Sequence, residues 1–140
     1  MKIAIFGSRD IDTKKAYNIL FKKMTTDNEY ITSGNIKGVA NEAIKVSKEK
    51  GIKITLYNYE SNLGYYTALK DIFIKNKKMI NSSEQAIVIW NAKSKGTKRE
   101  IDMLKKANKH FELDIIEPNK TLTFYDKKLN GFTNIKYIRK

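Results

Sequence analysis

Three short segments contain the residues with the clearest chemistry, and each follows a run of apolar residues. They are Gly7-Ser8-Arg9, residues 33–38, and Ser94-Lys95-Gly96-Thr97. Glycine and hydroxyl side chains let backbone N–H groups approach a ligand closely, and such groups bind anions where a helix begins. Arg9 and Lys95 add positive charge for a phosphate. The three segments therefore predict contacts with a phosphorylated ligand.

Two further polar residues could complete such a site. Glu100 is the acidic group just beyond the third segment, and Asn76 falls within the apolar stripe of a predicted helix. The stripe consists of Leu69, Ile72, Phe73 and Ile80. A buried amide needs hydrogen-bond partners, and a cleft is the obvious source of them. Capping of a neighbouring loop by Asn76 is the structural alternative.

Glu100 and Arg9 also have ordinary structural interpretations. The segment from Thr97 to Glu100 has the spacing of a capping box, in which the carboxylate returns to the Thr97 N–H. Arg9 could pair with Asp10 or Asp12 at the surface, although its place directly after a strand favours an anion contact. The sequence leaves both alternatives open.

Other candidates also have both a structural and a ligand interpretation. Lys75 is a solvated helix charge unless Asn76 faces the cleft, in which case Lys75 lies beside it. Asn35 and Asn91 suit ribose hydroxyls and ordinary turns alike. Trp90 ends a buried strand, so it packs in the core by default and stacks on a base in the sharper hypothesis.

Alternating strand and helix patterns must position these residues. Short apolar runs predict strands at Lys2–Phe6, Glu29–Thr32, Ile52–Tyr57, Ala86–Trp90 and Leu113–Ile116. Helical spacing of apolar residues predicts helices that start at Asp12 or Thr13, run from Val39 to Lys50, contain the stripe around Asn76, and start at Thr97. Gly51 has the position of a C-terminal helix stop.

This alternation predicts an α/β fold with a Rossmann-like five-stranded parallel sheet in the order 3-2-1-4-5 and helices on both faces. With the first strand beside the fourth, the loops at Gly7–Arg9 and Ser94–Thr97 flank the point where the strand order reverses. The turn at Ser33-Gly34-Asn35 through Gly38 lies one strand away. We therefore expect the three segments to converge.

The last residues have a different pattern. Pro118 marks the end of the alternating unit, and Lys128-Leu129-Asn130-Gly131 separates two strand-like runs, which predicts a β-hairpin. We expect a nucleotide-binding domain over residues 1–117 and a C-terminal hairpin appendage over 118–140. The hairpin could cover a sheet edge, form an oligomer contact or close over the site.

Composition narrows the class of protein. The 140 residues carry a formal net charge of +13, which favours a polyanionic partner from a nucleotide to nucleic acid, although many lysines fall on helix faces. There is no cysteine, and His110 is the single histidine, expected near a helix end as a cap or surface residue. We expect no metal site, cofactor, signal peptide or membrane span, and a cytoplasmic location.

The motifs resemble a known family, the YspA/YpsA-type branch of the SLOG superfamily, which is related to the LOG enzymes and to DNA-processing protein A. Gly7-Ser8-Arg9 is similar to its opening motif. Residues 33–40 resemble Ser-Gly-Gly-x-x-Gly-Ala-Asp, with Asn35 and Ala40 as departures. Residues 75–79 resemble Arg-Asn-x-x-Met with lysine first, and Ser94-Lys95-Gly96-Thr97 matches Ser-x-Gly-Thr. The resemblance spans residues 1–116.

The resemblance implies a pocket for a nucleotide or a nucleotide-derived ligand. Some members hydrolyse the N-glycosidic bond of nucleoside monophosphates with an Arg and a Glu beside the ribose. Here Glu100 matches the Glu, and Lys75 replaces the Arg, so these two residues are the catalytic candidates if the protein is an enzyme. Lysine cannot form the planar two-pronged contact of arginine. The replacement of the Arg by Lys75 therefore favours binding over turnover.

Three functions follow, in order of preference. The first is a module that senses or sequesters a small phosphorylated ligand, such as an ADP-ribose-type molecule or a nucleoside monophosphate. The second is a LOG-like N-glycosidase, and the third is a DNA-binding module. We expect a homo-oligomer, a dimer or larger. The ligand-binding candidates are Gly7, Ser8, Arg9, Ser33, Gly34, Asn35, Gly38, Asn76, Asn91, Ser94, Lys95, Gly96 and Thr97.

Overall fold

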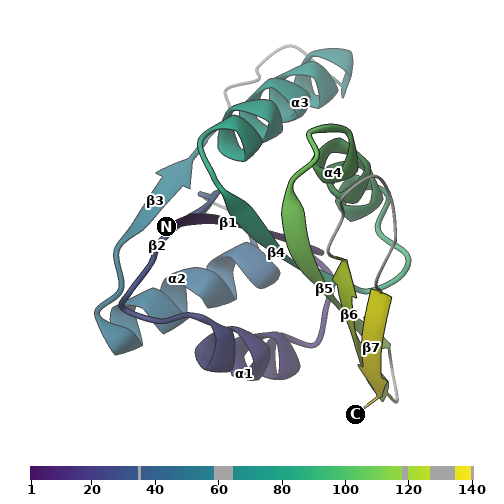
Figure 1. The fold of residues 1–140 in the computed structure, drawn as a ribbon. Coiled ribbons are helices and arrows are strands. Elements are labelled where there is room, and N and C mark those ends of the chain that lie inside the picture. The colour runs from purple at the N-terminus through teal and green to yellow at the C-terminus, as the bar shows by residue number, and fades with distance from the viewer. Residues whose placement is uncertain (35, 59–64, 118–119, 127–134, 140) are drawn as a thin grey trace.

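The computed structural model describes residues 1–34, 36–58, 65–117, 120–126 and 135–139. Its elements alternate between strand and helix for most of the chain (Figure 1). In order they are β1 (Lys2–Gly7), α1 (Thr13–Lys23), β2 (Glu29–Ser33), α2 (Val39–Lys50), β3 (Ile54–Tyr57), α3 (Tyr65–Asn81), β4 (Gln85–Trp90), α4 (Lys95–Lys106), β5 (His110–Glu117), β6 (Lys120–Asp126) and β7 (Ile135–Arg139).

The strands form one sheet in the order β3-β2-β1-β4-β5-β6-β7. The first five are parallel to their neighbours, so the predicted α/β, Rossmann-like order 3-2-1-4-5 is confirmed. The central pair is β1 with β4, in which Ala4 lies opposite Ala86 and Gly7 opposite Ile89. The strand order therefore reverses between β1 and β4, as the sequence predicts.

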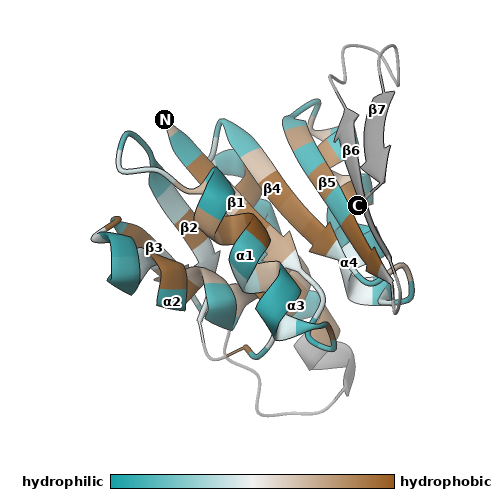
Figure 2. Ribbon diagram, turned by 90° about the horizontal axis from the view of Figure 1, so that it is seen from below, coloured by the Kyte–Doolittle hydropathy of each residue, from teal (hydrophilic) through white to brown (hydrophobic). Residues whose placement is uncertain are grey.

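Helices cover both faces of this sheet, with α1 and α2 on one side and α3 and α4 on the other (Figure 1). The central strands are buried on both faces and hydrophobic along their length (Figure 2). Alternate residues enter opposite cores, since Ile3 and Ile5 pack with α1 and α2 while Ala4 and Phe6 pack with α3 and α4. The period-two geometry of a strand gives this division.

Several helix ends fall where the sequence predicts them. The Asp12 side chain accepts a hydrogen bond from Lys15 N at the start of α1. Gly51 follows α2 in the left-handed conformation with φ of 68°. Other boundaries differ from the prediction: β3 begins at Ile54 rather than Ile52, and β5 begins at His110, which is a strand residue and not a helix cap.

The predicted buried stripe of α3 is wrong in part. Ile80 is buried, but Phe73 is 52% exposed and Leu69 and Ile72 are only partly buried. The face that packs against the sheet instead includes Lys75, Asn76 and Met79. Leu69, Ile72 and Phe73 line a cavity, described below, so this part of the predicted stripe borders open space rather than a filled core.

The C-terminal hairpin belongs to the same sheet as the rest of the chain. Strand β6 pairs antiparallel with β5, and β7 pairs antiparallel with β6. The hairpin therefore covers the edge of β5, one of the three roles considered above. The Asn130-Gly131 turn lies outside the described residues. No helix in the described chain is long and apolar enough to cross a membrane.

Candidate functional site

The loops after β1 and β4 and the start of α2 meet at the carboxyl edge of the sheet. Asn91 N donates to Ser8 Oγ over 3.0 Å, and Ser8 Oγ lies 3.2 Å from Thr97 Oγ1. On the other side, Val39 N donates to the Ser8 carbonyl oxygen over 3.2 Å. Ser8 is therefore the buried junction of the three predicted segments.

The first turn of α4 differs from the capping box that the sequence suggests. The helix begins at Lys95, and Ser94 is its N-cap, with Ser94 Oγ accepting from Thr97 N over 3.3 Å. Thr97 lies within the first turn and is buried by its contact with Ser8. Glu100 therefore has no capping role, and its carboxylate is directed elsewhere.

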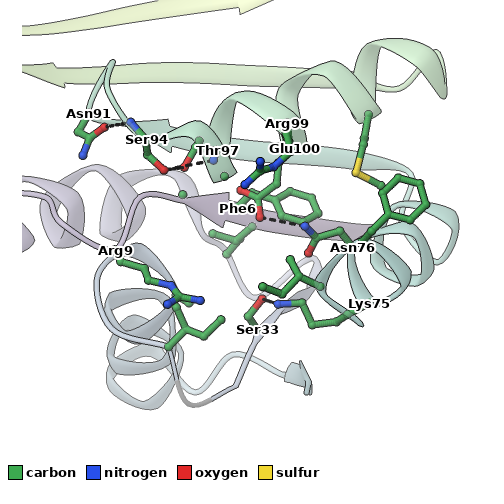
Figure 3. Close-up of a pocket in the computed structure, with 18 of the residues that line it drawn as sticks. Phe6, Arg9, Ser33, Lys75, Asn76, Asn91, Ser94, Thr97, Arg99 and Glu100 are labelled. Atoms are coloured by element: carbon green, nitrogen blue, oxygen red, sulfur yellow. Dashed lines mark hydrogen bonds between the residues drawn. The ribbon is translucent and has the colours of Figure 1, made fainter. Parts of the chain in front are cut away.

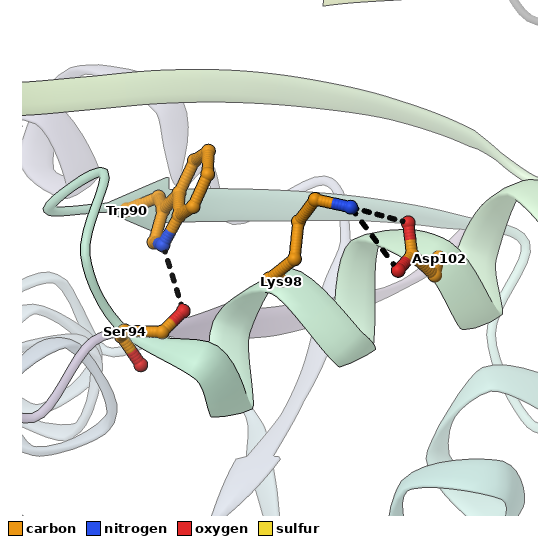
Figure 4. A network of polar contacts seen from close by, with 4 residues as sticks. All are labelled: Trp90, Ser94, Lys98 and Asp102. Carbon is orange, nitrogen blue, oxygen red and sulfur yellow. Dashed lines mark hydrogen bonds and ion pairs between the residues drawn. The ribbon is translucent and has the colours of Figure 1, made fainter.

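Asn91 and Trp90 shape the loop that precedes α4. Asn91 Oδ1 accepts from the N–H groups of Lys93 and Ser94 over 2.8 Å each, and its Nδ2 donates to the Asp10 carbonyl oxygen over 2.7 Å. The indole N–H of Trp90 donates to the Ser94 carbonyl oxygen over 3.0 Å (Figure 4). These contacts fix the direction in which α4 leaves the sheet.

A cavity of about 650 Å³ opens beside this junction, between α4, α3 and the ends of β1 and β2 (Figure 3). Its volume suits a ligand of nucleotide size. Ten of the predicted site residues line it: Gly7, Arg9, Ser33, Lys75, Asn76, Asn91, Ser94, Gly96, Thr97 and Glu100. Segments far apart in the sequence thus contribute to one concave surface.

Four other predicted ligand residues do not line the cavity: Ser8, Gly34, Gly38 and Lys95. Ser8 and Gly38 instead support its wall. Gly38 has φ of 85°, and a Cβ there would lie 2.4 Å from the Ser8 carbonyl oxygen, so only glycine permits this close approach. Asn35 lies outside the described residues.

Sequence reasoning missed three charged residues of the cavity wall, Asp10, Lys93 and Arg99. Each is adjacent in the sequence to a predicted site residue (Arg9, Ser94 and Glu100 respectively), and this is the only signal that could have indicated them. It also missed the apolar part of the wall, which comprises Ile5, Phe6, Ile36, Ala40, Leu69, Ile72, Phe73 and Met103. A cavity with an apolar wall and a few polar groups can accommodate a heterocyclic ring.

Lys75 is a buried lysine in the cavity wall. It is 4% exposed, and its Nζ donates to Ser33 Oγ over 2.7 Å. Burial lowers the pKa of Lys75 below its ordinary value, Glu100 opposes that effect, and the positive charge of Arg9 adds to it. Asn76 faces the cavity and Lys75 lines it beside Asn76, which is the second of the two alternatives from the sequence, while Lys78 on the same helix is exposed.

Glu100 and Asn76 form a second polar pair across the cavity from Arg9 (Figure 3). Asn76 Nδ2 donates to Glu100 Oε2 over 3.3 Å. Burial raises the pKa of Glu100 to about 8, while Lys75 and the Asn76 hydrogen bond act to lower it. Asn76 is 4% exposed, and its Oδ1 has no hydrogen-bond partner within the described part of the chain.

Arg9 is exposed and forms no ion pair with Asp10 or Asp12 in the described structure. Its guanidinium points toward the cavity (Figure 3). Basic side chains outnumber acidic ones in the cavity wall, with Arg9, Lys75, Lys93 and Arg99 against Asp10 and Glu100. The cavity is therefore suited to an anionic ligand.

Comparison with protein-family models and with curated proteins returned no match.

Proposed function

We propose that the protein binds a small phosphorylated nucleotide-derived ligand, of the ADP-ribose or nucleoside monophosphate type, and senses or sequesters it. The observation that carries this proposal is the 650 Å³ cavity where the loops of β1 and β4 meet, lined by more basic than acidic groups. The resemblance to the SLOG superfamily points to the same ligand class. The phosphate lies at the first turn of α4, near Arg9.

The opposite wall of the cavity supports a ligand with polar groups away from its phosphate. Asn76 Oδ1 is a buried acceptor without a partner among the described residues, and an unpaired acceptor of this kind is destabilising in the free protein. A hydroxyl or amino group of the ligand satisfies it. Phe6 and Phe73 provide apolar surface for a base.

A thermal-shift screen of nucleoside monophosphates and ADP-ribose-type compounds tests the proposal. A ligand at 100 times its dissociation constant stabilises the folded state by about 2.7 kcal/mol, which is a readily measured shift. We expect Arg9→Ala to abolish the shift, because it removes the exposed charge at the phosphate end. Lys14→Ala, an exposed cation on α1 away from the cavity, is the matched control and keeps the shift.

Gly96→Val gives an independent test of the phosphate position. A Cβ at Gly96 has only Ser94 Oγ nearby, 3.8 Å away, so the substitution leaves the fold intact while filling the cavity wall. We expect an unchanged melting temperature without ligand and no ligand-induced shift. Full retention of the shift in both Gly96→Val and Arg9→Ala contradicts the proposal.

A second candidate function is LOG-like N-glycosidase activity, and the raised pKa of Glu100 favours it. A carboxyl with a pKa of about 8 is mostly protonated at neutral pH, so it can give a proton to a departing base. Chromatography of nucleotide mixtures after incubation detects the released base. Intact ligand after long incubation, with binding demonstrated, excludes turnover and leaves the binding function.

We also propose that the protein forms a homo-oligomer in the cytoplasm. Large apolar side chains are exposed on β3 and α3, with Leu56 at 44%, Phe73 at 52% and Ile74 at 41%. A contact between subunits would bury exposed apolar surface of this kind. Light scattering of the purified protein gives the molar mass, and a monomeric mass contradicts this expectation.

A further inference from the structure

Lys75 is unlike the other lysines near it on α3. Lys77 and Lys78 are exposed, whereas Lys75 is 4% exposed and lines the cavity with its Nζ 2.7 Å from Ser33 Oγ. Its side chain points along the cavity wall toward the end of β2 (Figure 3). The amine is therefore held in place where a bound ligand would lie.

The surroundings of Lys75 increase the share of the neutral amine relative to an exposed lysine. Burial lowers the pKa of Lys75 and the charge of Arg9 acts in the same direction, while Glu100 acts to raise it. A neutral amine has a lone pair and reacts as a nucleophile, whereas a solvent-exposed lysine is almost wholly protonated at neutral pH. Desolvation of a lysine in a pocket is an established route to an amine that attacks carbonyl carbons.

The cavity also contains an acid and an anion-binding end. Glu100, beside Asn76, is mostly a neutral carboxylic acid at neutral pH because burial raises its pKa to about 8. The start of α4, marked by its N-cap Ser94, lies across the cavity from Lys75 (Figure 3). An amine, a proton donor and a phosphate-binding end are thus arranged around one space.

We propose that Lys75 forms a reversible imine with a phosphorylated aldehyde held in this cavity, its phosphate at the first turn of α4. The inference rests on the proposed function only for the phosphate end of the site. It adds a covalent chemistry and a ligand class that simple nucleotide binding does not require. The ligand has an aldehyde at one end and a phosphate at the other.

The reaction balances with no oxidant or reductant. The Lys75 Nζ lone pair attacks the carbonyl carbon to form a C–N bond, and one proton passes from nitrogen to the carbonyl oxygen to give a carbinolamine. Glu100 then gives its proton to the carbinolamine hydroxyl, which leaves as water as the C=N bond forms. The products are a protonated imine, the Glu100 carboxylate and water.

Reductive trapping tests this inference. The intact protein is incubated at pH 7 with substoichiometric pyridoxal 5′-phosphate, which has an aldehyde and a phosphate on one ring, and borohydride then reduces any imine to a stable amine. Peptide mass spectrometry locates the adduct. We expect Lys75 to be modified on the order of ten-fold more than Lys78, its exposed neighbour on α3.

Matched variants and a matched probe complete the experiment. Lys78→Arg keeps the adduct at Lys75, and Lys75→Arg removes it without raising modification elsewhere. Pyridoxal, which lacks the phosphate, modifies Lys75 less than pyridoxal 5′-phosphate does. Modification of Lys75 no greater than that of Lys78 in the wild-type protein overturns the inference, whether or not Lys75→Arg folds.

The outcomes also separate this inference from the proposed function. Nucleotide-dependent thermal shifts with no adduct at Lys75 overturn the imine and leave the binding function in place. An adduct at Lys75 in a protein that no nucleotide stabilises supports the imine and overturns nucleotide binding. Protection of Lys75 by a nucleoside monophosphate supports both and places the two ligands in one cavity.

Discussion

The hydroxyl residues of the motifs act first on the protein itself. Ser94 Oγ accepts from Thr97 N and lies 3.2 Å from Thr97 Oγ1, which in turn lies 3.2 Å from Ser8 Oγ. This chain of contacts connects the end of β1 to the first turn of α4. Residues that the sequence suggests as ligand contacts thus also hold the first turn of α4 in its orientation, as a preorganised site requires.

Two buried ionisable side chains are the second feature of the individual site residues. Lys75 and Glu100 both lie in the cavity wall, and burial shifts the pKa of each toward its neutral form. Groups with shifted pKa values in a cleft are typical of functional sites. Because their pKa values differ between the folded and unfolded states, the free energy of unfolding should depend on pH.

Glu100→Gln should change the pH dependence of stability. The folded-state pKa of about 8 lies above the ordinary 4.5, so the folded protein binds this proton more tightly than the unfolded chain. The contribution of the Glu100 proton to the free energy of unfolding is complete below about pH 4.5 and is lost as pH rises through about 8. In this range the free energy of unfolding falls by up to about 1.4 kcal/mol per pH unit. Lys75 opposes this trend at higher pH, because its lowered pKa makes the unfolded chain bind a proton more tightly.

Urea denaturation at pH 5.5 and 8.5 measures the effect. We expect the free energy of unfolding of the wild-type protein to be lower at pH 8.5 than at pH 5.5, and this difference to be smaller in Glu100→Gln. Glu49→Gln, an exposed site on α2, is the matched control and follows wild type. Identical pH dependence in Glu100→Gln and wild type contradicts burial of the carboxyl.

Close approaches between elements set the geometry of the cavity wall. The end of β1 packs directly against the start of α2, where a Cβ added at Gly7 would lie 2.4 Å from Val39 Cβ. Gly38 makes a similar approach to the Ser8 and Arg9 backbone. These glycines therefore position α2 against the first loop, whereas Gly96 borders open space.

A pair of alanine substitutions tests this distinction. Gly7→Ala should lower the free energy of unfolding by about 1–3 kcal/mol, because the methyl group overpacks against a β-branched side chain at a helix start. Gly96→Ala should leave it unchanged or raise it by up to about 1 kcal/mol, since alanine favours the helix. Chemical denaturation of both variants measures the difference, and equal effects contradict the packing of β1 against α2.

Across the whole molecule, an ion-pair cluster connects α1 to β5. Lys23 Nζ lies 3.2 Å from Glu112 Oε1 and 3.5 Å from Asp114 Oδ2. The Asp114 side chain is fully buried, and a buried carboxylate requires compensation. Lys23 and Glu112 are 89 positions apart in the sequence, so their hydrogen bond stabilises the assembled sheet rather than a local turn.

Lys23→Ala should therefore destabilise the fold. We expect a loss of about 2 kcal/mol, because a buried carboxylate loses a charged partner. Lys22→Ala removes the adjacent exposed lysine and should change stability by less than about 0.5 kcal/mol. Thermal and urea denaturation give both values. Similar small effects in the two variants would show that Lys23 has no special role.

The sequence by itself determined the order of the elements, the parallel sheet and the convergence of the site segments. These features follow from local patterns, because apolar periodicity distinguishes strand from helix and the topology of parallel sheets places strand ends together. Asp12 and Gly51 were likewise predictable from their own side-chain or backbone preferences. Each of these predictions depends on neighbours close in the chain.

Only the tertiary structure decided which face of α3 packs inward and which hydroxyl caps α4. Helical periodicity shows that residues share a face, but not whether that face meets a filled core or a cavity, so Phe73 is exposed and Lys75 is buried. Ser94 and Thr97 are both capable N-caps; in the structure Ser94 caps the helix, while the Thr97 hydroxyl contacts Ser8 in the loop after β1. Contacts between distant segments decide such choices because local preferences there are nearly equal.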